Sequence, residues 1–393
     1  MRDTFELVRL FGVPIRFHWS WFAVIALITW TLAAGYFPAQ LPEASAALSW
    51  LSGLMAALLL FGSVLLHELS HAVVARRVGL PVSGITLHVF GGVAQLEREP
   101  DSPRSEFLMA VVGPLTSYAV GAACWMALRI AAWPPAGGAI LAYLGAVNVL
   151  VGTFNLVPGF PLDGGRLLRS ALWAWRGDLG WATRIAGQAG SGFAFVLMAW
   201  GGLQLATGEV IGGAWLILIG LFLHQAASAS YAQLVARRSL ERVPVHDVMA
   251  RRVVTVPAGA MLDQLVDTYF WSHHVTSFPV TESARDGDGV LGIVTINHVK
   301  AVPQEEWPST AVRDVMIGLS HELSIAPSAS CWEALGKLTR NGVGRLVVLH
   351  ANRLVGYLSV RDVLHVLTLQ VARGDTVVPL GRGGARRVLD RAA

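Results

Sequence analysis

Charged residues are scarce in this chain of 393 residues. Only 14% of the residues are Asp, Glu, Lys or Arg, whereas a soluble domain is usually about 25% charged. Hydrophobic residues make up 54%, and the mean hydropathy is +0.53. Charges are sparse from about Trp19 to about Tyr231 and ordinary from Val235 onward. A wholly soluble chain is therefore excluded, and we expect a membrane part followed by a soluble part.

Cysteine and clustered basic residues are also lacking. The two cysteines, Cys124 and Cys331, fall in different parts of the chain, which excludes a disulfide framework. The formal net charge is +4, but the basic residues are scattered and form no stripe interleaved with aromatic residues, so we expect no nucleic-acid partner. The N-terminus lacks the pattern of a cleavable signal, so the first span itself is expected to direct the chain to the membrane.

Six apolar stretches are long enough to cross about 30 Å of hydrocarbon. They predict a polytopic α-helical membrane protein with about six transmembrane helices, surrounded by membrane lipid. The expected spans are Trp19–Tyr36, Leu51–Val74, Phe107–Ala131, Ala139–Val157, Ile185–Ala206 and Gly212–Leu234.

Arginine is distributed unequally between the two sets of loops. Arginines precede the first and third spans and follow the second, fourth and sixth, whereas the loops near 38–49, 133–138 and 207–210 contain no Lys or Arg. Cytoplasmic loops carry the excess of basic residues in membrane proteins. We therefore predict a multi-pass protein of the cell (plasma) membrane whose N- and C-termini are both cytoplasmic.

The second span contains three ionisable residues, His67, Glu68 and His71, in the stretch LLLFGSVLLHELSHAVV. Ionisable residues inside a span are rare and usually mark a functional site. Two histidines four residues apart lie on one face of a helix, where both imidazoles can bind one metal ion. Glu68 would lie beside the attacking water and accept its proton. The pattern predicts one zinc ion per chain and hydrolytic chemistry.

Two histidines leave a zinc ion short of protein ligands, so a third ligand must come from elsewhere. The fourth span ends in NLVPGFPLDGGR, in which Asn155 closes the apolar run and prolines and glycines break the helix before Asp163. Broken backbone at membrane depth is tolerated where it is buried in protein or lines a watery cavity. Asp163 can complete a two-histidine, one-carboxylate site, or it can simply cap the helix that follows. The residues by themselves leave both roles open.

Together, HELSH in an early span and NLVPGFPLDGGR in a later one resemble the site-2 protease family of intramembrane zinc proteases, over about residues 11–234. The resemblance implies that His67, His71 and Asp163 bind zinc and that Glu68 is the catalytic base. It also implies cleavage of membrane-anchored proteins in or near a transmembrane segment (regulated intramembrane proteolysis), with anti-sigma factors and similar regulators as a substrate class.

The resemblance extends to a segment after the second span. The stretch HVFGGVAQLE alternates Val, Ala and Leu before charged residues, which predicts a β-hairpin over His88–Glu97. In the family this element presents an extended substrate strand, which implies a substrate-binding role for Gly91 and Gly92. Asn155 matches an asparagine that lies near the family's site and contacts the substrate or the reacting carbonyl. A purely structural hairpin is the alternative.

The soluble part contains an internal repeat. Val245–Pro257 returns as Val312–Pro327, and each copy continues with a helical stretch, a strand and a closing segment, GIVTINHV or GYLSVRDV. This alternation resembles a tandem pair of CBS domains, which we expect to form a C-terminal α/β domain. The expected divisions are a transmembrane metalloprotease domain at 1–238, CBS domain 1 at 243–302, CBS domain 2 at 310–370 and a disordered tail at 372–393.

CBS pairs often bind an adenine nucleotide, so the resemblance implies ATP, ADP or AMP as a ligand. In that family a Ser or Thr and an Asp of the closing segment hold ribose and phosphate. The second copy has Ser359 and Asp362 at these positions, whereas the first has Thr295 but His298 in place of the Asp. At most one standard site is therefore expected. A pair that only forms a homodimer, or that docks on the protease, is the alternative.

A CBS-regulated membrane transporter or channel is the alternative function, because CBS pairs also accompany such proteins. Transport calls for repeated span patterns or paired broken segments in two matching halves, and the spans show no such repeat. An inactive descendant that binds membrane partners is a further alternative, against which the full set of expected ligands argues. The sequence favours a zinc metalloendopeptidase inside the membrane, regulated by its CBS pair.

Overall fold

The computed structural model describes residues 4–10, 12–88, 91–96, 99–282 and 289–372. The chain divides into two compact units, Met1–Tyr231 and Ala232–Ala393, hereafter the membrane unit and the CBS unit. Six helical segments of the described residues are long and apolar enough to cross a membrane, which confirms the predicted polytopic architecture. These segments are Ser20–Gln40, Ala46–Arg77, Pro103–Ile130, Pro135–Asn155, Leu179–Ala206 and Val210–Glu241.

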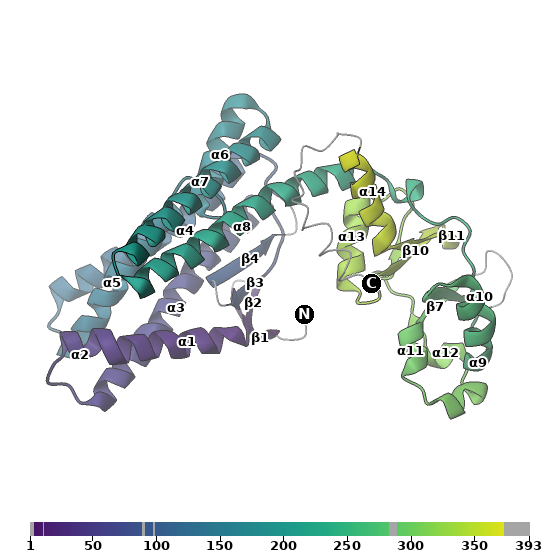
Figure 1. Cartoon of the computed structure of the whole chain (residues 1–393), viewed down its shortest axis with the longest axis horizontal. Helices are drawn as coiled ribbons and strands as arrows, with labels where there is room; N and C mark the ends of the chain where they lie inside the picture. The colour runs from purple at the N-terminus through teal and green to yellow at the C-terminus, as the bar shows by residue number, and fades with distance from the viewer. Residues whose placement is uncertain (1–3, 11, 89–90, 97–98, 283–288, 373–393) are drawn as a thin grey trace. The chain divides into compact units, whose positions relative to one another are not determined.

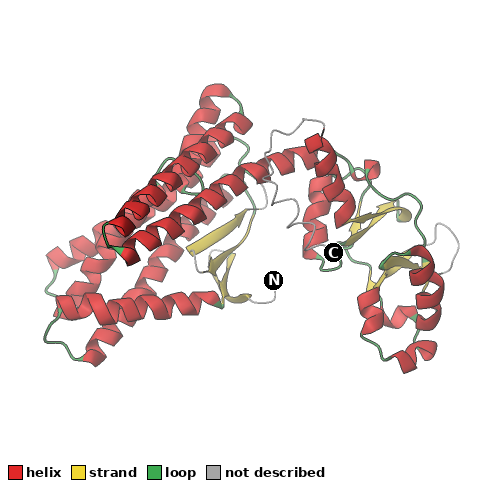
Figure 2. Ribbon diagram, viewed as in Figure 1, coloured by secondary structure: helices red, strands yellow, loops and turns green. Residues whose placement is uncertain are grey.

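Helices dominate the membrane unit, and a small sheet accompanies them (Figures 1 and 2). A π-helical turn joins α1 to α2, so the first span is one continuous helical segment. The helices are α1 (Ser20–Thr31), α2 (Phe37–Gln40), α3 (Ala46–Arg77), α4 (Pro103–Ile130), α5 (Pro135–Asn155), α6 (Asp163–Arg176), α7 (Leu179–Ala206) and α8 (Val210–Glu241). The strands are β1 (Thr4–Leu10), β2 (Val13–His18), β3 (Val82–His88) and β4 (Gly91–Leu96).

The sheet of the membrane unit has the order β1-β2-β3-β4. Two antiparallel hairpins, β1–β2 and β3–β4, are joined by the parallel pairing of β2 with β3, in which Ile15 lies opposite Ile85. Alternate residues of the central strands point toward the helices and are buried, as expected for a sheet with one covered face. The sheet covers the part of α3 that carries the two histidines. The buried residues of this contact are Val13, Ile15, Phe17, Leu69, Ala72, Ile85 and Leu87.

The predicted β-hairpin over His88–Glu97 needs correction. The hairpin begins earlier, because β3 starts at Val82 and His88 is its last residue. The predicted segment therefore supplies only the second strand, β4, whereas Glu97 lies outside the described residues. The strands β1 and β2 were not predicted at all. The pairing of β2 with β3 joins residues about seventy positions apart, so it depends on the tertiary fold and no local pattern in the sequence reveals it.

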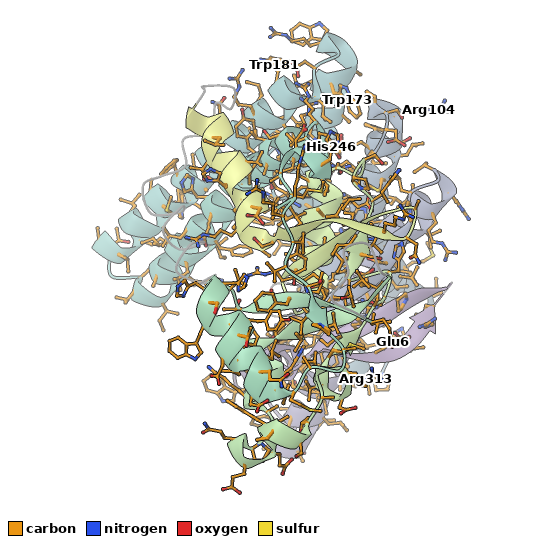
Figure 3. All side chains as sticks on the ribbon, turned by 90° about the vertical axis from the view of Figure 1, so that its right-hand side faces the viewer. Glu6, Arg104, Trp173, Trp181, His246 and Arg313 are labelled. Atoms are coloured by element: carbon orange, nitrogen blue, oxygen red, sulfur yellow. The ribbon has the colours of Figure 1, made fainter. Side chains whose placement is uncertain are left out.

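Helix α4 is the central helix of the membrane unit, packed against α3, α5 and α6. Helix α6 packs chiefly against α4 and α7. At the turn between α6 and α7, the Arg176 guanidinium lies 4.6 Å from the centroid of the Trp181 ring; Figure 3 labels Trp173 and Trp181 near this turn. Helices α7 and α8 approach closely at Gly201, where a Cβ would lie 2.5 Å from the Gly213 carbonyl oxygen. Small residues permit such close contact between helices in membranes.

The CBS unit contains two copies of one strand pattern. In the first, β5 (Val256–Pro257) pairs parallel with β6 (Ser277–Thr281), which pairs antiparallel with β7 (Val290–Thr295). In the second, β9 (Ser324–Ile325) pairs parallel with β10 (Arg345–His350), which pairs antiparallel with β11 (Arg353–Ser359). The remaining elements include α9 (Leu262–Gln264), α10 (Trp271–His273), α11 (Ile296–Lys300), α12 (Val312–Val315), β8 (Ile317–Gly318), α13 (Cys331–Arg340) and α14 (Val360–Ala372). The internal repeat of the sequence is thus a repeat of topology.

A segment from each copy pairs with a strand of the other copy. Strand β8, near the start of the second copy, pairs with β7 of the first. In the other direction, Ala250 of the first copy forms a β-bridge with Tyr357 in β11 of the second. Two glycines at equivalent positions of the copies, Gly292 and Gly356, leave room for these segments. A Cβ at Gly292 would lie 2.2 Å from the Ile317 carbonyl oxygen, and a Cβ at Gly356 would lie 2.3 Å from the Met249 sulfur. The two copies are therefore joined by backbone pairing in both directions.

Candidate metal centre

Helix α3 brings His67 and His71 onto one buried face, with exposed fractions of 5% and 7%. Each ring is bonded through Nδ1 to helix α4. His67 Nδ1 lies 2.9 Å from the Ser117 hydroxyl, and His71 Nδ1 donates to the Met109 carbonyl oxygen over 2.6 Å. A carbonyl oxygen only accepts, so the proton of neutral His71 is on Nδ1 and the lone pair on Nε2 is free for a metal. Such second bonds orient metal-binding histidines.

Asp163 lies where both Nε2 atoms point. Its Oδ2 atom is 3.1 Å from His67 Nε2 and 3.2 Å from His71 Nε2. The residue before it, Leu162, is the N-cap of α6, and no side-chain hydrogen bond caps this helix. Helix capping, the alternative role left open by the sequence, is therefore not what the Asp163 carboxylate does here. Its oxygen faces the two imidazoles instead.

The three donor atoms have the spacing that a zinc ion requires. All three lie within 4.8 Å of one another. A tetrahedral zinc ion with bonds of about 2.0–2.1 Å holds its ligand atoms about 3.3 Å apart, close to the two Nε2–Oδ2 distances. Two imidazoles and one carboxylate are also a common donor set of zinc enzymes. The residues present fit the ion.

Gly113 of α4 keeps the space beside the imidazoles open. A Cβ at this position would lie 2.2 Å from His71 Nε2 and 2.6 Å from His67 Nε2. Any other residue would place its β-carbon against both donor atoms. Met109, Gly113 and Ser117 follow one another at helical spacing on one face of α4, so this helix forms the wall of the site. The sequence interpretation missed all three; the only signal was Gly and Ser four residues apart within a span.

Glu68 follows His67 on α3 and is half-buried. Its carboxylate interacts electrostatically with His67, His71 and Asp163. The catalytic candidate thus lies with the three predicted ligands, although the sequence separates Asp163 from Glu68 by more than ninety residues. A half-buried carboxylate remains reachable by water and can exchange protons with it.

The loop between α5 and α6 brings Asp163 to this position through two close backbone contacts. A Cβ at Gly164 would lie 2.3 Å from the Val157 carbonyl oxygen, and one at Gly165 would lie 2.4 Å from the Gly159 carbonyl carbon. The two glycines after Asp163 therefore let α6 begin directly against the loop. Buried irregular backbone of this kind is expected at membrane depth only inside protein.

The other predicted site residues lie on neighbouring elements. Asn155 ends α5, and its side-chain amide donates to the Val151 carbonyl oxygen over 3.1 Å. Gly91 and Gly92 open β4 and pair with His88 and Leu87 of β3. In the sheet order β4 stands at one edge. Among the hydrogen bonds of the described residues, none joins Asn155 to the two histidines or to the aspartate.

The CBS unit has a cavity of about 340 Å³ between its two copies. Thr295 and His298 of the first copy line it, together with Asn341 and Arg345 of the second. The Thr295 backbone N–H donates to His298 Nδ1 over 3.3 Å, and burial lowers the pKa of the His298 imidazole. The Arg345 guanidinium gives the cavity a positive charge, and Nε donates to the Ser277 hydroxyl over 3.0 Å.

Ser359 and Asp362, the other predicted nucleotide-binding residues, bond to each other. The Asp362 carboxylate accepts from the Ser359 hydroxyl over 2.7 Å and from the Ser359 backbone N–H over 2.8 Å. These bonds close the first turn of α14. Neither residue lines the 340 Å³ cavity, so among the described residues only Thr295 of the predicted set faces it.

Comparisons with known proteins agree with the class that the site and the spans define. The model of peptidase family M50 matches residues 55–140 and 131–199, and the CBS domain model matches residues 245–304 and 312–369. A Mycobacterium tuberculosis protein named zinc metalloprotease Rip3 is 33% identical over 371 residues, which cover 93% of each chain. The chain belongs to peptidase family M50, the site-2 type of zinc metalloprotease, and carries a tandem CBS pair.

One further relative and one solved structure are also similar to this chain. A Synechocystis protein named zinc metalloprotease sll0528 is 31% identical over 375 residues, covering 95% of this chain and 97% of its own. The solved site-2 protease from Methanocaldococcus jannaschii is 27% identical, covers 58% of this chain and 95% of its own, and has a TM-score of 0.40. The two family models and the two relatives above 30% identity confirm the resemblances to the site-2 proteases and to the CBS pair, and with them the enzyme class. The family implies a zinc ion and membrane protein substrates.

Proposed function

We propose that this protein hydrolyses peptide bonds in or near the transmembrane segments of membrane-anchored proteins. His67, His71 and Asp163 hold the zinc ion, and Glu68 is the catalytic base. The observation that carries this proposal is the convergence of the two Nε2 atoms and Oδ2. Beside them, Gly113 has no side chain that would fill the space for the ion. Such a constellation would be costly inside a membrane without a function for its polar groups.

The residues of the site divide the work of hydrolysis between them. When bound, zinc acts as a Lewis acid that polarises the scissile carbonyl and acidifies water. Glu68 takes the proton of the attacking water onto its carboxylate and passes it to the leaving amine. Ser117 and the Met109 carbonyl hold the imidazoles in one orientation, so both Nε2 lone pairs stay directed at the same point. Helix α4 and the sheet keep the two histidines buried, with the sheet packed on the same turns of α3.

Strand β4 is the proposed substrate platform. A helical substrate must unwind before its peptide bonds can be attacked, and an extended segment can pair with the edge of a sheet. The sheet order puts β4 at an edge, and its sheet covers the histidine-bearing turns of α3. Gly91 and Gly92 offer backbone without side chains to such a strand. Asn155, at the end of α5, is proposed to contact the substrate.

We further propose a location in the cell membrane with both termini in the cytoplasm, on the arginine distribution of the loops. Water then reaches the site from the cytoplasmic side. The substrates are membrane-anchored regulators, of which anti-sigma factors are one class. The protease domain is assigned to residues 1–238, the CBS domains to 243–302 and 310–370, and a disordered tail to 372–393.

The CBS unit is proposed to bind an adenine nucleotide and to regulate access to the protease. The support is the cavity between the copies, with Arg345 to attract phosphate and Thr295 to hold ribose or phosphate. Ser359 and Asp362, which the resemblance assigns to the one standard site, could hold a nucleotide only if their mutual hydrogen bond opened. Dimerisation through the CBS unit is the other proposed role of the pair.

The decisive test compares the purified parent with Glu68→Gln, assaying zinc content and cleavage of a model membrane-anchored substrate together. Glu209→Gln, in the loop between α7 and α8, is the matched control. We expect about one zinc ion in all three proteins and cleavage by the parent and the control only. A parent without zinc would overturn the assignment of the metal centre. Cleavage by Glu68→Gln at the parent's rate would overturn the role of Glu68.

A further inference from the structure

A buried charge pair joins α4 to α6 about two helical turns from the metal centre. Glu106 of α4 is fully buried, and Arg169 of α6 has an exposed fraction of 6%. Arg169 Nε donates to Glu106 Oε1 over 2.6 Å, and a second guanidinium nitrogen contacts the same oxygen. The guanidinium carbon lies 5.2 Å from the centroid of the Phe160 ring, in the loop before α6. Glu99 is a weaker partner, 3.8 Å from Arg169.

Stability alone does not explain why this pair is there. Removing two charges from water carries a desolvation cost that is roughly as large as their attraction, so apolar residues often serve equally well. Glu106 Oε2 has no hydrogen-bond partner among the described residues, which adds to the cost. A buried pair that stabilises little can still select one arrangement of two helices.

The pair and the metal centre lie at matching distances along the two helices. Gly113 is seven residues after Glu106, about 10 Å along α4, and Asp163 is six residues before Arg169, about 9 Å along α6. The pair therefore fixes α6 antiparallel to α4 in the register that sets Asp163 beside Gly113. A slip of one residue would rotate Asp163 by about 100° and move it about 1.5 Å.

We propose that the Glu106–Arg169 pair is a positioning device for the metal centre. Helix α4 already orients both histidines through Met109 and Ser117. Through Glu106 it also sets the third ligand, which comes from a helix that packs chiefly on α4 and α7. One helix thus aligns ligands from two others. This inference rests on the proposed zinc ligation by His67, His71 and Asp163.

The test measures zinc affinity by chelator competition, thermal stability and cleavage kinetics in the full-length protein. The variants are Arg169→Met, Arg169→Lys and the neutral double variant Glu106→Met with Arg169→Met. Arg237→Met is the control, because Arg237 pairs with Glu241 over 2.6 Å at the end of α8 and takes no part in the contact between α4 and α6. Arg169→Met, which leaves a buried carboxylate unpaired, is expected to lose both stability and about 10–100-fold in zinc affinity.

The double variant separates positioning from stability. We expect its melting temperature to return to the parent's, because no buried charge is left unpaired, while its zinc affinity stays about 10-fold or more below the parent's. At saturating zinc its kcat should be reduced and its KM unchanged, and Arg169→Lys should restore part of the affinity. Parental zinc affinity in the double variant would overturn the inference while leaving the metal centre intact. A parent that binds no zinc would overturn both.

Discussion

The metal centre and the CBS cavity differ in how deeply their polar side chains are buried. In the metal centre, His67 and His71 are almost fully buried, and each is held from behind by α4. In the CBS cavity, Thr295, Asn341 and Arg345 are half-buried and line open space. The first arrangement fixes one geometry before any ligand arrives, as catalysis requires. The second leaves room for a ligand whose binding can be regulated.

A second contrast exists within the CBS unit. His298 and Asp362 occupy equivalent positions in the two copies, and each accepts the backbone N–H three residues earlier, from Thr295 and Ser359 respectively. The same helix start is thus built with a neutral imidazole in one copy and a carboxylate in the other. The two copies therefore share a backbone arrangement at this turn but differ in the charge of the side chain that accepts the N–H.

The largest effect is expected from filling the metal centre. In Gly113→Ala, the new methyl group would occupy the space beside both Nε2 atoms, so zinc affinity should fall by more than about 100-fold, beyond the usual effect of an outer-shell change. Chelator competition and zinc content measure the loss. Gly192→Ala in α7, where a Cβ would meet nothing within 4 Å, should bind zinc as the parent does. Unchanged affinity in Gly113→Ala would show that the ion binds elsewhere.

An intermediate effect is expected from removing the hydrogen bond that orients His67. Ser117→Ala removes the hydroxyl at His67 Nδ1, so zinc affinity should fall by about 10-fold, at the low end for such partners. The neighbouring Thr116→Ala is the control, because the Thr116 hydroxyl bonds the Val112 carbonyl of its own helix. Equal losses in the two variants would mean that the Ser117 bond has no special part in the site.

The smallest effect concerns the contrast between the CBS copies. Burial lowers the pKa of His298 from its usual 6.5, so the folded chain binds this proton less readily than the unfolded chain. The stability that neutral His298 contributes is complete above pH 6.5 and is lost as the pH falls through that value toward the lower, folded pKa.

The melting temperature of the CBS unit, followed in the full-length protein, should therefore fall more between about pH 7 and pH 5 in the parent than in His298→Asp. The substituted carboxylate accepts the Thr295 N–H at both values, as Asp362 does for Ser359. Titrating ATP, ADP and AMP in the same experiment tests the proposed ligand, and His298→Asp is expected to bind more tightly. Identical pH profiles of the parent and His298→Asp would show that His298 does not cause the pH dependence of the melting temperature.

Much of the protein was predictable because its signals are local. Span length and charge distribution predicted the six membrane-crossing helices, and the repeat of Val245–Pro257 at Val312–Pro327 predicted two equivalent copies. The helical spacing of His67 and His71 predicted that both rings share a face. Asp163 was a candidate from the sequence, yet its residues alone did not decide between capping and ligation. The family resemblance favoured ligation, and the Oδ2 distances agree with it.

The sequence by itself determined the six apolar helices, the repeat and the chemical types at the site, because periodicity and residue type act over a few turns. Only the tertiary structure decided which residues surround them: the sheet of β1 to β4, the wall formed by Met109, Gly113 and Ser117, and the Glu106–Arg169 pair. A glycine or serine in a span carries no distinctive local signal. Its role depends on the helix packed against it, which the fold alone fixes.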